Sequence, residues 1–284
     1  MSYKKLRGYI QLARVDKPIG IYLLLWPTLW ALICASNGFV HIEDLTLFVL
    51  GVFLSRSAGC VINDIFDKNF DKKVHRTKLR PLVSGVLEKR EAFILFFILL
   101  FCASCLMFFL TPLAIKVVFI SALLLCTYPL AKRFMKIPQI YLGMAFSSSI
   151  LVVFAHVNKS FPLICWQLFL ANFFWVMAYD TIYAKEDYGD DVKLNIYSAP
   201  KFFKGKTIFY TNLFYFLMFF FFYQVVSQFN DTFFVFLLIL TLFIISIIRV
   251  RKLALKESKF IKLFKENNYL GAIMMVILLF VVNY

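Results

Sequence analysis

Long apolar runs recur along the whole of this 284-residue chain and constrain its fold more than any other feature. A membrane-spanning helix needs roughly 20 mostly apolar residues to cross a hydrocarbon core of about 30 Å. Runs that approach or reach this length cover residues 19–36, 45–62, 93–111, 113–131, 140–157, 161–180, 208–226, 232–250 and 269–283. The ten-residue alternation of a membrane β-barrel is absent, and helices are the other way to satisfy the backbone inside lipid. The sequence therefore predicts an all-α integral membrane protein with nine transmembrane helices.

The placement of charge orients this bundle. The net charge is +15, and Lys and Arg gather in the short cytoplasmic loops of membrane proteins. Every Lys and Arg except Arg56, Lys116 and Lys159 lies before the first apolar run or at a loop that follows an even-numbered run. This alternation predicts a cytoplasmic N-terminus and a C-terminus outside. Because no basic stripe stands on a soluble domain, a nucleic-acid role is disfavoured, and we expect one domain over residues 1–284.

Half of the acidic residues lie in two short stretches, residues 63–71 and 180–191, each of which begins where an apolar run ends. Both follow runs that end on the predicted cytoplasmic side. Carboxylates near hydrocarbon are costly unless a cation neutralises them. Mg²⁺ takes oxygen ligands, keeps several waters and commonly bridges carboxylates to a phosphate. The two stretches therefore predict a divalent-metal site at the cytoplasmic membrane boundary.

Spacing in the first stretch favours one ligand-bearing face. If the helix of the second run continues past its apolar part, Asn63, Asp67 and Asp71 lie at i, i+4 and nearly i+7, with Asp64 beside them. An alternative is a solvated loop in which these aspartates pair with Lys68, Lys72 and Lys73.

In the second stretch, Asp187 and Asp191 are four residues apart. Gly189 lowers helix propensity between them, which favours a broken helix or a turn there. Two acidic clusters on one side of a bundle suit two metal ions that bind a diphosphate from opposite sides.

A diphosphate also needs direct cationic contacts, which Arg makes as planar bidentate pairs and Lys as a point charge. The candidate basic residues are Arg56, Lys68, Arg76, Arg80, Lys132 and Arg133. Arg56 lies inside an apolar run, where an ionised side chain is costly, so we interpret it as a functional residue. The alternative is that Arg56 snorkels to the interface or pairs helices. For Lys132 and Arg133 the alternative is simple anchoring of the topology.

The motifs resemble those of a known family. Residues 63–71 have the pattern NDxxDxxxD and are followed by Arg80-Pro81-Leu82, which resembles the UbiA superfamily of intramembrane prenyltransferases. Residues 12–20, LARVDKPIG, and residues 24–32, LLWPTLWAL, are similar to the 4-hydroxybenzoate polyprenyltransferase family within it. The resemblance extends through residue 191 to about residue 200.

The resemblance implies a ring of nine transmembrane helices around a central cavity, with bound Mg²⁺. The first ion would have the ligands Asn63, Asp64, Asp67 and Asp71. Asp187 and Asp191 would bind the second ion. Tyr188-Gly189 departs from the more polar pair expected between these aspartates, which puts the local helix geometry in question but removes no ligand.

The resemblance also implies roles for single residues. Tyr128 and Lys132 match a Tyr-x-x-x-Lys element at a cytoplasmic helix end, and with Asp67 and Asp191 they form the expected catalytic set. Arg14 is the candidate to meet the carboxylate of the aromatic substrate; alternatively, it only marks the membrane entry.

The implied reaction is transfer of a polyprenyl group from polyprenyl diphosphate to C3 of 4-hydroxybenzoate, in ubiquinone biosynthesis, at the cytoplasmic face of the cell inner membrane. Another acceptor, haem B or a naphthoate, is an alternative that the two N-terminal motifs disfavour. A transporter is a further alternative, but it would distribute polar residues through the spans, whereas here they gather at one face.

Overall fold

A computed structural model describes the chain except residues 1–2, 74–76, 194–196, 255–259 and 284 and the side chains of residues 129, 132, 133, 190, 191, 253 and 254. The regular secondary structure of the described residues is helical. The α-helices are α1 (Tyr3–Leu12), α2 (Ile19–Ala35), α3 (Ile42–Asp71), α4 (Lys89–Leu106), α5 (Pro112–Phe134), α6 (Pro138–Val157), α7 (Leu163–Glu186), α8 (Tyr188–Lys193), α9 (Ala199–Phe203), α10 (Thr207–Val226), α11 (Phe233–Ala254) and α12 (Phe260–Asn283). Short 3₁₀ turns cover Met107–Phe109 and Lys204–Lys206.

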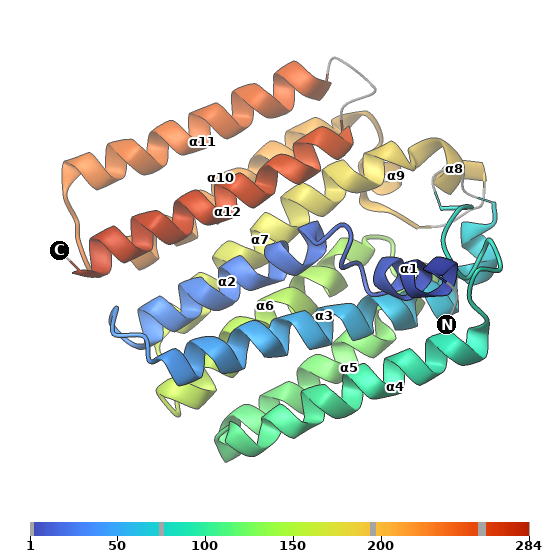
Figure 1. Cartoon of the computed structure of the whole chain (residues 1–284). Helices are drawn as coiled ribbons and strands as arrows, with labels where there is room; N and C mark the ends of the chain where they lie inside the picture. Colours follow the sequence, from blue (N-terminus) through green and yellow to red (C-terminus); the bar gives the residue numbers. More distant parts are fainter. Residues whose placement is uncertain (1–2, 74–76, 194–196, 255–259, 284) are drawn as a thin grey trace.

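The long helices run side by side as a bundle (Figure 1). Both α3 and α7, which carry the two acidic stretches, finish at the same end of this bundle, where α1, α8 and α9 also lie. We call this end the motif end. The chain starts near the motif end and finishes at the opposite end. The prediction that both acidic stretches lie on one side of the bundle is confirmed.

The protein is a multi-pass membrane protein. In the described part of the chain, 7 helical segments are long and apolar enough to cross a membrane, and α2 and α5 carry shorter apolar segments. Each of the nine predicted apolar runs falls on one of these helices. Only 11% of the apolar window of α4 and 17% of that of α11 is buried inside the protein. These two helices therefore present most of their apolar surface outward, as expected of lipid-facing helices.

Several helices extend beyond the apolar runs that predicted them. Helix α3 continues to Asp71, α7 continues to Glu186, and α12 begins at Phe260, well before residue 269. The predicted helix start at residue 269 is therefore wrong. Hydropathy reports only the part of a helix that lies in hydrocarbon, whereas backbone hydrogen bonding carries the helix on through the interface.

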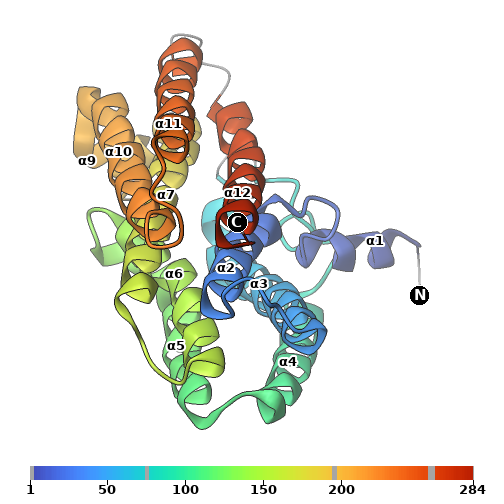
Figure 2. The same cartoon turned by 90° about the vertical axis from the view of Figure 1, so that its left-hand side faces the viewer.

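Helix α2 lies at the centre of the packing and contacts α3, α6, α7 and α12 (Figure 2). Trp30 of α2 and Trp175 of α7 are fully buried, with ring centroids 5.0 Å apart. The Trp30 indole donates a hydrogen bond of 3.1 Å to the carbonyl of Gly271 on α12. A Cβ atom at Gly271 would lie 2.5 Å from Cδ1 of Trp26, so glycine is what allows α12 to approach this closely.

Buried polar groups also connect these helices. Oδ1 of Asn267 on α12 accepts hydrogen bonds of 2.8 Å from the Trp175 indole and of 2.8 Å from the Tyr215 hydroxyl on α10. Its amide nitrogen donates to the carbonyl of Leu263. Both the oxygen and the nitrogen of the Asn267 amide are therefore hydrogen-bonded, and this network holds α7, α10 and α12 in fixed positions relative to one another.

A second, smaller apolar cluster lies at the motif end. It combines Leu12 of α1, Val61 and Ile65 of α3, and Leu82 and Leu87 of the loop after α3. Each of these side chains is at least nine-tenths buried. The cluster therefore packs the α3–α4 loop and the end of α1 against the last turns of α3, where the first acidic stretch lies.

Candidate active site

Asp64 is the most deeply buried carboxylate of the first stretch, with 1% of its surface exposed. Nη2 of Arg14 donates to both of its oxygens, at 2.9 and 3.0 Å. Nη1 of Arg80 donates to Oδ1 at 2.9 Å. A buried, ionised carboxylate is strongly unfavourable unless it is paired and hydrogen-bonded. Two guanidinium groups supply that compensation.

Asp71 lies two helical turns beyond Asp64 on the same face of α3, because a spacing of seven residues returns to one face. Its Oδ2 accepts a hydrogen bond of 2.6 Å from Nη1 of Arg80. One guanidinium nitrogen therefore bridges the two carboxylates. We call Arg14, Asp64, Asp71 and Arg80 the carboxylate–arginine cluster.

The loop after α3 places Arg80 in this cluster. The Thr77 hydroxyl donates to the backbone carbonyl of Asp71 at 2.9 Å, and the Arg80 backbone N–H donates to the Thr77 carbonyl at 2.9 Å. Leu82, which follows Pro81, is 1% exposed in the smaller apolar cluster. The apolar anchor on one side of Arg80 and the turn on the other return its side chain to the end of α3.

Arg14 is placed by the end of α1. Its φ is +60°, a left-handed conformation that costs a non-glycine residue roughly 1–2 kcal/mol. Buried Leu12 anchors the preceding turn, and Nη1 of Arg14 donates to the carbonyl of Gln11 at 3.2 Å. Helix α1 is itself held on α4 by a 2.6 Å ion pair between Lys5 and Glu91, and this hydrogen bond raises the pKa of Lys5 above its usual value.

Among the other residues of the first stretch, Asn63 has a hydrogen-bond acceptor atom that is not satisfied. Oδ1 of Asn63 is buried and has no hydrogen-bond partner among the described residues. Asp67 lies one turn further along the same face, and Lys68 follows it; both side chains are half-buried. A buried amide oxygen without a partner is the kind of atom that a hard cation such as Mg²⁺ coordinates.

The second stretch lies where α7 ends. Asp187 terminates the helix with φ −93° and ψ 6°, and α8 begins at the next residue. The predicted break in the helix is present, but it falls at Asp187 and not at Gly189. Tyr183, one turn earlier, packs on Phe264 of α12 with ring centroids 4.5 Å apart, which fixes the last turns of α7.

Glu186 was not predicted as a site residue. Its Oε2 atom is buried and has no hydrogen-bond partner among the described residues. The only sequence signal for a role of Glu186 was its position directly before Asp187. Which side chains face the protein interior near a helix end depends on where the helix stops, and the sequence did not give that position. Its orphaned oxygen adds an acceptor to the second stretch.

Arg56 lies two turns before Asn63 on α3. Its Nε atom donates to the carbonyl of Gly20 on α2 at 3.1 Å, and its guanidinium lies 5.1 Å from the centroid of the Phe146 ring on α6. A Cβ atom at Gly20 would lie 2.8 Å from Nη2 of Arg56. In this structure Arg56 therefore connects α3 with α2 and α6, as the helix-pairing alternative describes.

The remaining predicted residues are described only in part. Tyr128 lies on α5 and packs against the main apolar core. Arg76 lies outside the described residues, as do the side chains of Lys132, Arg133 and Asp191. Their predicted roles stay predictions.

A complete metal-binding set is not assembled within the described part of the chain, where no three Asp, Glu, His or Cys side chains converge on one point. The oxygen donors that are described fit Mg²⁺ nonetheless, because this ion binds through one or two carboxylates and completes its shell with water and phosphate oxygens. The last turns of α3, which carry Asn63, Asp64 and Asp71, and the end of α7 both lie at the motif end (Figure 1).

Known proteins resemble this chain over almost its full length. The model of the UbiA prenyltransferase family matches residues 24–268. A 4-hydroxybenzoate octaprenyltransferase of Pasteurella multocida is 42% identical over 291 residues, covering 99% of this chain and 97% of that protein. A 4-hydroxybenzoate octaprenyltransferase of Histophilus somni is 42% identical over 278 residues, covering 97% of each chain.

The fold is shared with solved structures. A UbiA homolog from Archaeoglobus fulgidus bound to GPP and Mg²⁺ superimposes with a TM-score of 0.71, covering 98% of this chain and 100% of that one. Its sequence identity is 15%, so this likeness concerns the fold alone.

Proposed function

This chain belongs to the UbiA prenyltransferase family, and from that premise we propose how its residues carry out prenyl transfer. It is a 4-hydroxybenzoate polyprenyltransferase, which joins the allylic carbon of a polyprenyl diphosphate to the aromatic ring and releases pyrophosphate. The observation that carries the assignment of the site is the carboxylate–arginine cluster, in which a carboxylate with 1% exposure is shared between two arginines at the membrane boundary.

We assign the metal ligands as the motifs suggest. Asn63, Asp64, Asp67 and Asp71 would hold one Mg²⁺. Asp187 and Asp191 would hold the second. Bound there, Mg²⁺ supplies the positive charge that stabilises pyrophosphate as it leaves. Two observations on this chain support the assignment: the orphaned amide oxygen of Asn63 and the orphaned carboxylate oxygen of Glu186 beside Asp187.

The basic residues complete the electrostatic environment. Arg80 already bridges two carboxylates of α3, and its guanidinium would also contribute positive charge to the binding of the phosphate oxygens. Arg56, Lys68, Lys132 and the remaining cations of the motif end would contact the diphosphate directly. Tyr128, four residues before Lys132, would orient this group.

Arg14 is our candidate for the carboxylate of 4-hydroxybenzoate. Its side chain is 27% exposed while Asp64, its partner, is 1% exposed, so Arg14 forms the accessible rim of the cluster. A guanidinium there would orient the ring with its hydroxyl toward the reacting carbon. The phenol oxygen makes the ring electron-rich at C3, and a carboxylate of the first stretch, Asp67, or of the second, Asp191, accepts the ring proton.

The membrane arrangement is part of the proposal. Nine transmembrane helices with the N-terminus in the cytoplasm would place the motif end at the cytoplasmic face of the inner membrane. The positions of the chain ends at opposite ends of the bundle support an odd number of spans. The prenyl chain would lie in an apolar cavity between the helices, open sideways to lipid.

The test is an assay of membranes that contain this protein, with ring-labelled 4-hydroxybenzoate, a polyprenyl diphosphate and Mg²⁺. We expect a labelled product that partitions into organic solvent, and its loss when EDTA removes the metal. Membranes containing Asp231→Asn, which changes an aspartate far from the motif end, serve as the control and should keep full activity. Transfer that persists in EDTA would contradict the metal assignment, and label that never enters the lipid phase would contradict the substrate.

A further inference from the structure

Helix α1 combines a packed face with an exposed apolar face. Gly8 and Leu12 are buried against the rest of the protein. On another side of the same helix, Tyr3, Leu6 and Ile10 are 81%, 49% and 39% exposed. Residues with this spacing share one face of a helix. We call Tyr3, Leu6 and Ile10 the α1 stripe.

The packing of α1 shows which way the α1 stripe faces. A Cβ atom at Gly8 would lie 3.0 Å from Cγ1 of Val86, so this side of α1 faces the loop that precedes α4. Lys5, on the next side of the helix, pairs with Glu91 in the first turn of α4. The direction from Gly8 to Lys5 around α1 therefore follows the chain from the loop into α4. The α1 stripe is the next side in the same sense of rotation, so it faces the level of the apolar, outward-facing part of α4.

The position of α1 relative to the bundle agrees with this direction. Figure 1 places α1 at the motif end, and Figure 2 shows it projecting sideways from the long helices. The end of a membrane-spanning bundle is where the hydrocarbon core gives way to the headgroups. A helix that projects sideways at this level has lipid beside it.

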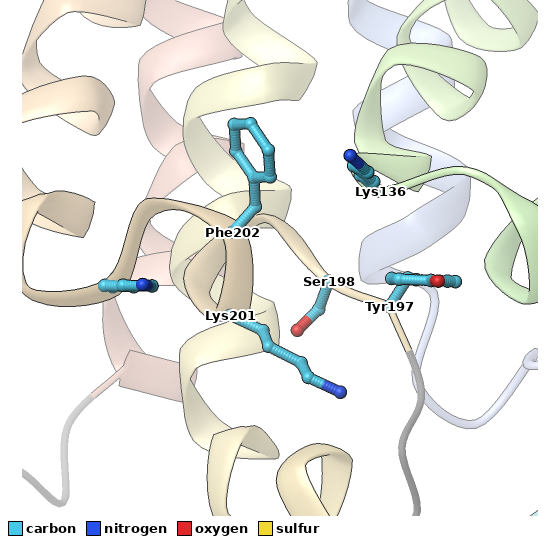
Figure 3. A pocket seen from close by; sticks show the side chains of 6 residues that line it. Lys136, Tyr197, Ser198, Lys201 and Phe202 are labelled. Atoms are coloured by element: carbon cyan, nitrogen blue, oxygen red, sulfur yellow. The ribbon is translucent and has the colours of Figure 1, made fainter.

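Other side chains of the motif end are also of the interfacial kind. Tyr197 and Phe202 are 39% and 50% exposed, and they line an open pocket together with Lys136 and Lys201 (Figure 3). Aromatic rings gather at the headgroup level of a bilayer, and lysine stems lie along apolar surface while the ammonium group reaches water. These residues support the placement of the motif end at the membrane interface.

The charge of α1 complements a phospholipid surface. The helix has three basic residues and no acidic one. Lys4 and Arg7 are exposed and follow the α1 stripe around the helix, on the side away from Lys5. An apolar side flanked by Lys and Arg, on a helix whose other residues are polar, is the pattern of helices that lie in the plane of the membrane interface.

We propose that α1 is an interfacial helix that docks on the lipid bilayer. The α1 stripe is immersed among the lipids beside α4, and Lys4 and Arg7 face the headgroup phosphates. Helix α1 ends two residues before Arg14, which hydrogen-bonds to buried Asp64. Contact with the bilayer therefore holds the segment that carries Arg14 at the membrane surface.

Spin-label accessibility in the full chain tests this proposal. The background protein has the substitutions Cys102→Ala, Cys105→Ala and Cys126→Ala, so that the cysteines left are the buried ones. Single nitroxide labels are then attached in four variants, Leu6→Cys, Ile10→Cys, Arg7→Cys and Lys4→Cys. Each protein is placed in vesicles of equimolar phosphatidylcholine and phosphatidylglycerol. Collision rates of the label are measured with oxygen, which concentrates in hydrocarbon, and with a water-soluble nickel chelate.

The ratio of the oxygen rate to the nickel rate should be at least about threefold higher at Leu6 and Ile10 than at Lys4. Lys4 is the matched control, because it lies on nearly the opposite side of the same helix from Leu6. Arg7, between the two sides, should give an intermediate ratio. A label at Phe97→Cys, on the exposed side of α4, gives the value for hydrocarbon.

Two results would overturn the proposal. Ratios at Leu6 and Ile10 no higher than at Lys4 would mean that the α1 stripe faces water. Low collision rates with both reagents at Leu6 and Ile10 would mean that a protein partner or a second copy of the chain covers the stripe in place of lipid. Because the two labelled positions are exposed and independent, failure of one variant to fold leaves the other as the test.

Discussion

At the scale of single residues, the distinctive feature is how Asp64 is kept charged while it is almost fully buried. Its two oxygens receive three hydrogen bonds from Arg14 and Arg80. Breaking a buried ion pair by removing one partner is far more costly than never forming it, because the other charge is left uncompensated. The effects of substitutions within the cluster on the free energy of unfolding should therefore not be additive.

Arg80→Gln should lower the free energy of unfolding by about 2 kcal/mol, since Asp64 and Asp71 lose their shared guanidinium while water reaches part of the site. In the double variant with Asp64→Asn the loss should be smaller than the sum of the two single losses. Thermal unfolding of the wild type, the two single variants and the double variant in detergent measures these losses. Strictly additive losses would mean that the ion pair contributes nothing to the fold.

Asp67→Asn tests the first metal-binding stretch. The carboxylate lies one turn from the orphaned oxygen of Asn63 on the same face of α3, so its loss should reduce Mg²⁺-dependent transfer by about a hundredfold or more while membrane insertion stays intact. Asp231→Asn, at an exposed aspartate between α10 and α11, is the isosteric control. Near-normal turnover of the purified Asp67→Asn protein would remove this residue from the site.

The sequence allowed part of the site to be predicted. The spacing of Asn63, Asp67 and Asp71 is local information, and its interpretation as one helical face depended on the helix continuing past Ile62. Helix α3 does continue to Asp71. The pairing of Asp64 with Arg14 and Arg80 depends on chain reversals after α1 and after α3, which local spacing does not encode. Arg14 was predicted from the resemblance and from the geometry of its guanidinium group, and nothing in the spacing indicated that it contacts Asp64.

At the scale of helices, α12 illustrates what hydropathy predicts and what it misses. The apolar run 269–283 identified the helix, but contacts define its position: Gly271 against two tryptophan rings and Asn267 between Trp175 and Tyr215. The short helices α1, α8 and α9 were not predicted as elements, because they lie outside the apolar runs on which the assignment relied.

Gly271→Ala should destabilise the protein by about 1–3 kcal/mol, because the new Cβ would lie 2.5 Å from Trp26 and 2.7 Å from Trp175, whose rings are packed in place. Gly51→Ala on α3 is the matched control. There the nearest atom would lie 4.0 Å from the new Cβ, so higher helix propensity should leave stability unchanged or raise it slightly. Equal melting temperatures of the two variants would contradict the tight approach of α12.

A partly buried histidine connects helices at the opposite end. His156 of α6 accepts a hydrogen bond from the Thr111 backbone at Nδ1 and pairs through Nε2 with Asp44 of α3 at 3.1 Å. Thr111 in turn caps α5 and donates to the carbonyl of Ala155. The sequence assigned no role to this histidine, because the three helices meet only in the folded bundle.

At the scale of the whole molecule, charge and chemistry are segregated to the same end. The acidic stretches and most of the cations share the motif end, whereas the opposite end has few charges. Lys and Arg hold a loop on the cytoplasmic side during insertion. In the proposed orientation, the cations that hold the loops in the cytoplasm would also surround the site from which the charged, water-soluble pyrophosphate leaves.

This segregation makes the orientation testable. With the N-terminus in the cytoplasm and nine spans, a reporter fused after Asn283 should lie outside, and one fused after Lys206, between α9 and α10, should lie inside. Alkaline phosphatase should therefore be active only in the first fusion, and green fluorescent protein should fluoresce only in the second. If both positions report the same side, the number of spans is even between them and the nine-span arrangement fails. If both report the reverse, the motif end faces outward, away from any cytoplasmic supply of diphosphate, and the proposed membrane orientation is wrong.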